Sequence, residues 1–161
     1  MKRERNLIHF NTSGRARMVD VSGKASTLRT ATATATVLVN DETFSLIKEG
    51  RIKKGDVLGV AQVAGIMAAK KNSSLIPMCH PVALTGVDIE FELDEASHAI
   101  RIEAIARCKG ETGVEMEALT AAAVAALTIY DMCKSAQKDI EITDLYLLSK
   151  TGGKSGDYTK K

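Results

Sequence analysis

The sequence, 161 residues long, predicts an α+β fold from the spacing of its hydrophobic residues. Three segments alternate apolar and polar residues, or alanine and threonine, with the period of a β-strand. Two longer segments repeat apolar residues at helical spacing, and a final strand follows the second of them. The order strand, helix, strand, strand, helix, strand is the split βαβ pattern of a ferredoxin-like sandwich. We therefore expect a four-stranded antiparallel sheet with the helices on one face.

The first strand is predicted at residues 30–39, which read TATATATVLV. Strict alternation places the alanines on one face, and such a small face predicts that another element packs closely against it. A short extra helix follows and extends to Lys48. Asp41 or Thr43 would cap its start, and Gly50 would end it.

The middle of the chain predicts a helix and a hairpin. Asp56 precedes residues 57–71, whose apolar side chains share one face of a helix. Two serines and two prolines interrupt regular structure between residues 72 and 81. Residues 86–93 and 99–107 then alternate as two strands around a polar turn, which predicts a hairpin with one buried face. The opposite face of this hairpin, where a second subunit could pack, carries Asp88, Glu90 and Glu92.

The second long helix is predicted from about residue 113 to residue 137. Thr112 and Glu115 have the spacing of a capping box, and alanine, the best helix former, dominates the segment that follows. Its most apolar stretch, residues 118–130, is shorter than the roughly 20 residues of a membrane span. Residues 140–148 close the order as the fourth strand.

Composition predicts one domain spanning residues 1–161, because 45% of residues are hydrophobic and 26% are charged. Aromatic residues make up only 4%, which argues against a base-stacking nucleic-acid surface. Three cysteines without a C-x-x-C motif predict neither a zinc site nor a disulfide framework. We expect a reducing, cytoplasmic setting.

The net charge of +2 conceals an asymmetry, because residues 1–17 carry +4, residues 150–161 carry +3 and the body carries −5. An acidic body with basic ends does not match a duplex-binding domain. Residues 1–15 and 151–161 are predicted to be mobile tails. These tails are either solvated or fold over an anionic ligand.

Carboxylates mark both ends of the second long helix. Asp131 and Lys134 are three residues apart, so they form either a surface ion pair or, if Asp131 is partly buried, a tuned proton-transfer pair. Glu117 lies fourteen residues before Asp131 on the same face, about 21 Å away. Either the two have separate roles, with Glu117 a partner of the helix dipole, or a two-fold partner brings the two helix ends together.

A rigid loop carries a second group of candidates. Pro77 and Pro81 restrict the backbone on either side of Met78, Cys79 and His80. His80 could act as an acid or base near neutral pH, or it could be incidental to the entry of a strand. Adjacent Cys79 and His80 lack the usual spacing of metal ligands, so no metal site is predicted.

Two lysine-bearing segments could bind an anion. Lys54 lies just before the helix at 57–71, where it could hold a phosphate, act as an acid, or lie in a solvated turn. The glycine-rich run at 150–156 resembles a phosphate loop, but a P-loop needs a glycine at position 148 and a helix afterwards. It could still place a lysine over an anion.

Five blocks of the sequence resemble the cyclic pyranopterin monophosphate synthases, the family of molybdenum cofactor biosynthesis protein C. The blocks, which span nearly the whole chain, are MVDVSGKAST at 18–27, KGDVLGVAQVAGIMAAK at 54–70, LIPMCHP at 75–81, TGVEMEALTAAAVAALTIYDMCK at 112–134 and LLSKTGGKSGD at 147–157.

The resemblance implies an enzyme of molybdenum cofactor biosynthesis that converts 3′,8-cyclo-7,8-dihydro-GTP to cyclic pyranopterin monophosphate and releases pyrophosphate. That reaction makes it a phosphorus–oxygen lyase. The resemblance also implies a homohexamer, built as a trimer of dimers, with the active site at a dimer interface. No protein-held cofactor is implied, although Mg²⁺ could accompany the substrate phosphates, and neither nucleic acid nor membrane is an expected partner.

The resemblance also implies roles for individual residues. Asp131 corresponds to the catalytic aspartate, with Lys134 beside it, and we expect Asp131 to orient and tune Lys134. Lys54 and His80 are the expected acids and bases of the ring steps. The positions that correspond to substrate contacts are Met78, Cys79, His80, Met116 and Glu117, together with the basic residues Arg17, Arg29 and Lys150.

Two other functions compete with this interpretation. A non-catalytic ferredoxin-like module could bind a nucleotide through its basic ends, and it would not need Asp131, Cys79 or His80. An RNA-binding protein would show a strongly salt-dependent affinity. The acidic body and the scarcity of aromatic residues argue against RNA binding.

Overall fold

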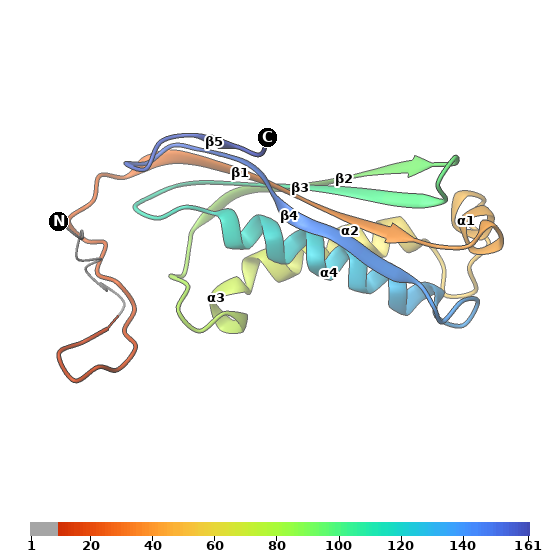
Figure 1. Ribbon diagram of the computed structural model, residues 1–161, viewed down its shortest axis with the longest axis horizontal. Helices are drawn as coiled ribbons and strands as arrows, with labels where there is room; N and C mark the ends of the chain where they lie inside the picture. The colour runs from red at the N-terminus through yellow and green to blue at the C-terminus, as the bar shows by residue number, and fades with distance from the viewer. Residues whose placement is uncertain (1–9) are drawn as a thin grey trace.

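The computed structural model describes residues 10–161. One sheet lies over a layer of helices (Figure 1), and the helices cover a single face of it. The elements in chain order are β1 (Thr27–Leu38), α1 (Asp41–Lys48), α2 (Val57–Lys70), α3 (Asn72–Leu75), β2 (Leu84–Asp94), β3 (Ala99–Gly110), α4 (Glu115–Cys133), β4 (Glu141–Thr151) and β5 (Tyr158–Thr159).

The sheet has the order β2-β3-β1-β4-β5, and every neighbouring pair is antiparallel. Its first four strands confirm the predicted ferredoxin-like order. The predicted count of four strands was wrong by one, because β5 pairs with the end of β4 through Ser149 with Thr159 and Lys150 with Tyr158. A two-residue strand is too short to show a period in the sequence, so only the pairing reveals it.

The chain ends differ from simple tails. Residues 151–161, where the sequence predicts a tail, turn back at Gly152 and Gly153, whose φ values are 86° and 82°. Such positive φ angles favour glycine because it has no Cβ. Near the other end, Phe10 and Ala16 form an isolated antiparallel bridge. The rest of the predicted N-terminal tail, residues 1–9, lies outside the described residues.

The core is built from small side chains, as the alternation in β1 predicts. Ala31, Ala33 and Ala35 of β1 are at most 1% exposed, and α4 lies against this face. The fully buried alanines of α4, which pack against the sheet or against α2, are Ala118, Ala121, Ala122, Ala125 and Ala126. Alanine on both elements lets the helix approach the sheet closely, so α4 is the central helix of the core.

Helix α4 is shorter than predicted, and the capping box is wrong. It begins at Glu115 after Val114, with no side-chain hydrogen bond to cap it, and it ends at Cys133 rather than near residue 137. By length and composition alone, α4 could cross a membrane, but more than half of its apolar window is buried inside the protein. Its apolar character is explained by its place in the core.

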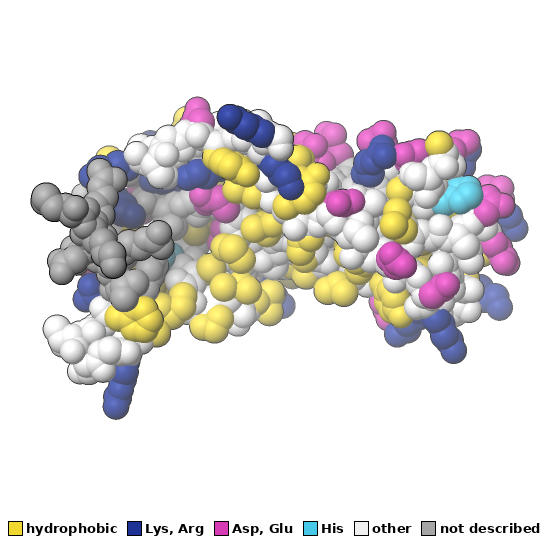
Figure 2. Space-filling model, in the orientation of Figure 1, with side chains coloured by type: hydrophobic (Ala, Val, Ile, Leu, Met, Phe, Trp, Pro, Cys, Tyr) yellow, Lys and Arg dark blue, Asp and Glu magenta, His cyan; other side chains and the backbone are white. Residues whose placement is uncertain are grey.

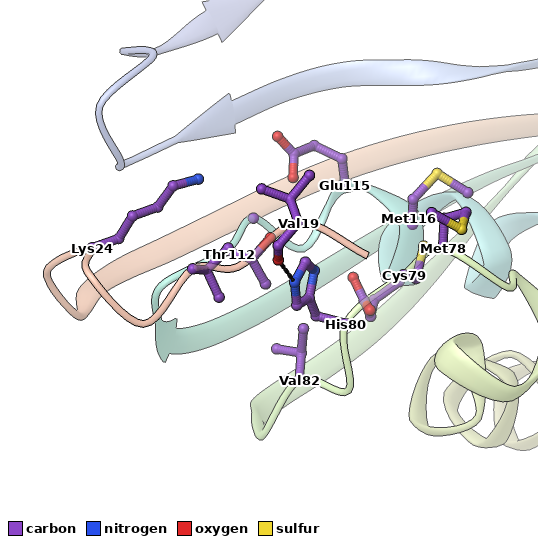
Figure 3. A pocket seen from close by; sticks show the side chains of 12 residues that line it. Val19, Lys24, Met78, Cys79, His80, Val82, Thr112, Glu115 and Met116 are labelled. Carbon is purple, nitrogen blue, oxygen red and sulfur yellow. Dashed lines mark hydrogen bonds between the residues drawn. The ribbon is translucent and has the colours of Figure 1, made fainter. Parts of the chain in front are cut away.

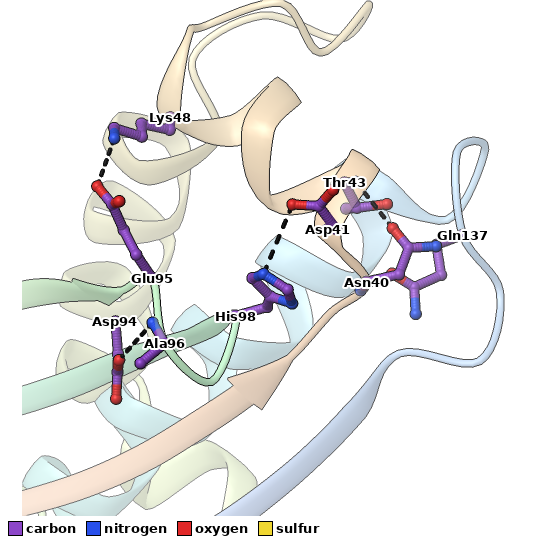
Figure 4. A network of polar contacts seen from close by, with 9 residues as sticks. All are labelled: Asn40, Asp41, Thr43, Lys48, Asp94, Glu95, Ala96, His98 and Gln137. Atoms are coloured by element: carbon purple, nitrogen blue, oxygen red, sulfur yellow. Dashed lines mark hydrogen bonds and ion pairs between the residues drawn. The ribbon is translucent and has the colours of Figure 1, made fainter.

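A network of polar contacts organises the far end of the molecule around α1 (Figure 4). Asn40, not Asp41 or Thr43, caps this helix, because its side chain accepts a hydrogen bond from the Thr43 backbone N–H at 2.8 Å. Gln137 accepts a hydrogen bond from the Asn40 backbone N–H at 2.8 Å, which ties α1 to the segment after α4. Lys48 pairs with Glu95 and His98 contacts Asp41, so α1 is also held to the β2–β3 turn.

Helix α2 and the sheet face opposite the helices match the predictions from the sequence, and one short helix, α3, was not predicted. Asp56 caps α2 by accepting from the Gly59 backbone N–H at 3.0 Å. The segment expected to be irregular after α2 contains the short helix α3. On β2, Ile89 is buried, whereas Asp88, Glu90 and Glu92 are exposed on the other face, as predicted. That a second subunit packs on this acidic face stays a prediction.

Candidate functional site

The proline-flanked loop forms one wall of a cavity of about 310 Å³ (Figure 3). Met78, Cys79 and His80 of this loop face the start of α4, which contributes Glu115, Met116 and Glu117 to the opposite wall. The segment around Val19 closes one side. The structure thus brings together five predicted substrate contacts, two from α4 and three from a loop more than thirty residues earlier in the chain.

His80 is held in place by a backbone group. Its Nε2 atom lies 2.6 Å from the carbonyl oxygen of Val19. A carbonyl only accepts, so Nε2 carries the proton, and in the neutral ring Nδ1 is then the acceptor. This contact also ties the segment before β1 to the cavity.

Glu117 is the buried carboxyl of the cavity, with only 4% of its surface exposed. Asn72 of α3 donates a hydrogen bond to its Oε1 atom at 2.9 Å. Burial raises the pKa of Glu117, the hydrogen bonds from its own backbone N–H and from Asn72 oppose this rise, and the neighbouring charge of Glu115 adds to it. A carboxyl in this environment is suited to exchanging a proton nearer neutral pH than an exposed glutamate.

A larger basic groove of about 820 Å³ adjoins this cavity, and the two share Lys24, Thr112, Gly113 and Glu115 in their walls. The cationic residues of the groove are Lys24, Arg29, Lys150 and Lys154. Two of these were predicted, Arg29 and Lys150. Together the four cations make the groove suited to an extended anion such as a polyphosphate.

Arg29 is fixed in this groove by the turn before α4. Its Nε donates to the carbonyl of Gly110 at 2.9 Å, and its Nη2 donates to the carbonyl of Glu111 at 3.1 Å. A Cβ on Gly153 would lie 2.1 Å from the Arg29 Nη1 atom. The absence of a side chain at Gly153 therefore lets the β4–β5 turn pass directly over the guanidinium group.

A second polar centre lies at the opposite end of α4. Lys54 Nζ is 2.8 Å from Asp131 Oδ2 and 2.7 Å from the Asp131 carbonyl oxygen, and Lys134 Nζ is 2.7 Å from Asp131 Oδ1. Side-chain hydrogen bonds from Lys134 and Lys54 lower the pKa of Asp131 to about 2. The same pairing raises the pKa of Lys134. All three side chains remain exposed to solvent by 40–56%, so a ligand can reach them.

The predicted residues therefore form two groups that one chain does not bring together. Helix α4 is continuous from Glu115 to Cys133, so Glu117 and Asp131 are about 21 Å apart along its axis. Arg17 is exposed and lies next to Met18 to Ser22, a segment that lines a further cavity with His80 and Glu111. The pairing of Lys54 with Asp131, which are 77 positions apart, was not predicted.

Sequence reasoning missed the cavity residues Lys24, Glu115 and Lys154, and it missed Asn72, which binds Glu117 from beneath the cavity. Glu115 was interpreted as part of a capping box, but it lines both cavities and lies 3.4 Å from Lys150. Lys24 lies within the first matching block, and Lys154 lies within the glycine-rich run, so position in these motifs was the available signal. Asn72 carried no such signal.

Comparisons with known proteins agree over nearly the whole chain. Residues 18–153 match the model of the MoaC family. A cyclic pyranopterin monophosphate synthase of Peptoclostridium acidaminophilum is 60% identical over 153 residues, which are 95% of this chain and 96% of that protein. Proteins of the same name are 58% identical over 156 residues in Thermoanaerobacter pseudethanolicus (97% and 99% covered) and 56% identical over 155 residues in Heliobacterium modesticaldum (96% and 98% covered). Every predicted site residue except Arg17 lies within the family match.

Proposed function

Since this chain belongs to the MoaC family, we propose that it is a cyclic pyranopterin monophosphate synthase of molybdenum cofactor biosynthesis. Its membership confirms the resemblance drawn from the five sequence blocks. The substrate we propose is 3′,8-cyclo-7,8-dihydro-GTP, and the products are cyclic pyranopterin monophosphate and pyrophosphate. The observation that carries this proposal is the cavity with His80 and Glu117 beside a groove of four cations. Such an arrangement suits a ligand with a heterocycle at one end and a triphosphate at the other.

We propose that each active site is shared by two subunits. Its two groups of residues are about 21 Å apart in one chain, which is farther than one small metabolite reaches. Antiparallel two-fold pairing of α4 helices would place Asp131 of one subunit near Glu117 of the other.

The outer side of the helix layer supplies a surface for this pairing. Val60, Val63 and Met67 of α2 and Leu127 of α4 are 45–62% exposed. Hydrophobic side chains gather across the middle of the molecule in Figure 2, in the region of these helices. Apolar residues that remain this exposed on one chain suit burial against a second copy. We propose a dimer as the active unit and, from the resemblance, a hexamer built of three such dimers.

The lysine–aspartate centre supports the ring steps in our proposal. Converting a purine-derived ring to a pterin requires protons to move on and off nitrogen and carbon. Asp131 stays ionised and holds both lysines, so it orients Lys54 as well as Lys134. A lysine can donate a proton to a ring nitrogen as the ring opens. His80 and Glu117 would exchange protons from the other wall.

The basic groove supports closure of the cyclic phosphate. In this step, a ribose-derived hydroxyl oxygen forms a bond to the α-phosphorus, the bond from that phosphorus to the bridging oxygen breaks, and pyrophosphate leaves with the electron pair. The hydroxyl proton passes to a base of the cavity. Arg29, Lys24, Lys150 and Lys154 would stabilise the charge that develops on the leaving group. This internal displacement, in which no water adds, is the reason we propose a phosphorus–oxygen lyase.

We propose that the protein itself holds no cofactor and acts in the cytoplasm without a nucleic-acid or membrane partner. Within residues 10–161, no group of three or more His, Cys, Asp and Glu side chains is placed to hold a metal ion. Any Mg²⁺ that accompanies the substrate would be held mainly by phosphate oxygens.

Incubation with the cyclised GTP tests this function. The purified protein is mixed with 3′,8-cyclo-7,8-dihydro-GTP, and pyrophosphate release and pterin fluorescence are followed. We expect turnover by the wild-type protein, loss of at least about a hundredfold in Asp131→Asn, as for a lost acid–base group, and wild-type turnover in Asp139→Asn. Binding of the substrate without pyrophosphate release would instead support the non-catalytic nucleotide-binding module.

A further inference from the structure

A buried polar cluster lies beneath the cavity, between α3 and α4. Asn72, the first residue of α3, is 1% exposed, and Glu117 is 4% exposed. The Asn72 Nδ2 atom donates to Glu117 Oε1 at 2.9 Å, and the Thr120 hydroxyl donates to Asn72 Oδ1 at 2.7 Å. Burying an amide is unfavourable unless both of its polar ends are paired, and here both are.

The partners determine which way the Asn72 amide points. An ionised carboxylate only accepts hydrogen bonds, so the NH₂ group must face Glu117. The carbonyl then faces Thr120, whose hydroxyl can donate. Because Thr120 lies one helical turn after Glu117, the two contacts hold the amide flat against the first turns of α4.

Asn72 also joins the two walls of the cavity. Glu117 belongs to the α4 wall, whereas Asn72 begins the segment that leads through α3 into the loop with Met78 and His80. The backbone carbonyl of Asn72 accepts a hydrogen bond from the Ile76 N–H at 2.9 Å, which turns the chain toward that loop. One buried side chain therefore fixes the carboxyl on one wall relative to the loop on the other.

We propose that Asn72 is a positioning residue that holds the Glu117 carboxyl in the cavity and favours its ionised form. Its consequence for turnover rests on the proposed function, but its effect on Glu117 does not.

The hydrogen bond from Asn72 acts against other influences on the pKa of Glu117. Burial raises the pKa of Glu117, and Glu115 of the same helix raises it further. Burial raises the pKa of the Cys108 thiol of β3, the charge of Arg29 opposes this rise, and the charge of Glu117 adds to it. The remaining titratable groups of the cavity wall are Lys24, Cys79 and His80. The Asn72 hydrogen bond is the contact from outside α4 that lowers the pKa of Glu117.

The decisive variant is Asn72→Leu, which keeps a similar volume but has no donor. Carboxyl ¹³C NMR of glutamate-labelled protein would follow the titration of Glu117, assigned by its loss in Glu117→Gln. We expect Asn72→Leu to raise the Glu117 pKa by about one to two units, because a hydrogen bond to a charged group is lost. Thr120→Val keeps Asn72 but removes the hydroxyl that donates to its amide carbonyl, so we expect a smaller rise in the Glu117 pKa. An unchanged titration in both variants would overturn the proposal.

A matched control comes from another amide of the helix layer. Gln62 of α2 donates to the Ile89 carbonyl at 3.3 Å and is half-buried. We expect Gln62→Leu to leave the Glu117 titration unchanged. An equal shift in this control would show a general effect of lost amides and would also overturn the proposal.

Turnover supplies a second readout that a merely structural role would not move. The acidic limb of the pH profile for pyrophosphate release should shift to higher pH in Asn72→Leu by the amount that NMR measures. In a Glu117→Gln background, Asn72→Leu should cause no further loss. An additive loss in the double variant would contradict a role through Glu117. If the wild-type protein releases no pyrophosphate, the proposed function fails, while the NMR titration still decides the role of Asn72.

Discussion

The separation of Asp131 and Glu117 makes a quantitative prediction about mixed subunits. The two carboxylates lie fourteen residues apart on one unbroken helix, about 21 Å along its axis. If two subunits build each site, Asp131→Asn removes a group from one side of a site and Glu117→Gln removes a group from the other. Each variant alone should keep only a small residual turnover, because every site lacks one group.

Mixing the two variants should restore activity. Each site takes its Asp131 from one subunit and its Glu117 from another, so random pairing in an equal mixture leaves both groups intact in about one quarter of the sites. We therefore expect about 25% of wild-type pyrophosphate release after the two variants are unfolded together and refolded, or are co-expressed. This fraction is the same for a dimer and for a trimer of dimers.

A control mixture tests whether the recovery comes from shared sites. Asp131→Asn and Lys134→Met alter the same end of α4, so their mixture should stay inactive. A complete site within one chain predicts no recovery from either mixture. No recovery from the Asp131→Asn and Glu117→Gln mixture, with subunit exchange verified by mass, would therefore refute the shared site.

Three further predictions concern ionisation and packing. Lys134→Met should raise the pKa of Asp131 from about 2 toward the 3.8 of an exposed aspartate, measured by carboxyl NMR, because the Lys134 hydrogen bond is the largest cause of the depression. Burial raises the pKa of Glu117 in the folded protein above its unfolded value of 4.5. The folded state therefore binds the carboxyl proton more tightly than the unfolded state, and the free energy of unfolding falls as pH rises from the unfolded pKa through the folded pKa. Glu117→Gln should thus be at least as stable as the wild type at pH 7 in thermal melts and lose this advantage below about pH 4. Gly65→Ala would place a Cβ 2.8 Å from the Ala121 carbonyl oxygen and push α2 from α4. This variant should lose about 1–2 kcal/mol of its free energy of unfolding, after the gain in helix propensity is subtracted.

Each of these predictions has a control and a contradicting outcome. Lys138→Met alters an exposed lysine near the same helix end and should leave Asp131 unchanged; equal shifts would show a general charge effect. A lower melting temperature of Glu117→Gln at pH 7 would show that the ionised form stabilises the fold. Gly86→Ala adds a Cβ with nothing within 4 Å, so it should stay within about 0.5 kcal/mol of the wild type. An equally stable Gly65→Ala would show that the helix crossing can relax.

Local patterns predicted much of the fold for a physical reason. The Ala/Thr alternation of β1 encodes two faces, and a periodic strand keeps those faces wherever it packs. The same holds for α2, where Asp56 caps the helix as expected. The capping residue of a helix is harder to predict than a periodic strand or helix face, because several nearby residues compete for the same backbone groups. Asn40 therefore replaces Asp41 and Thr43 at α1, and Glu115 turns to the cavity instead of closing a capping box.

The site was predicted where its residues are neighbours in sequence. Met78 to His80 lie between two prolines, and Asp131 and Lys134 are one helical turn apart, so spacing alone grouped them. The sequence by itself determined the strand and helix faces, the apolar core helix and these two local groups, because each depends on short-range geometry.

Only the tertiary structure decided which distant residues meet. It pairs Lys54 with Asp131 across 77 positions, places Asn72 beneath Glu117, and lays the Gly153 turn over Arg29 to complete a basic groove. It also adds β5 at the edge of the sheet. These contacts depend on how helices and strands pack together, and no local period in the chain carries that information.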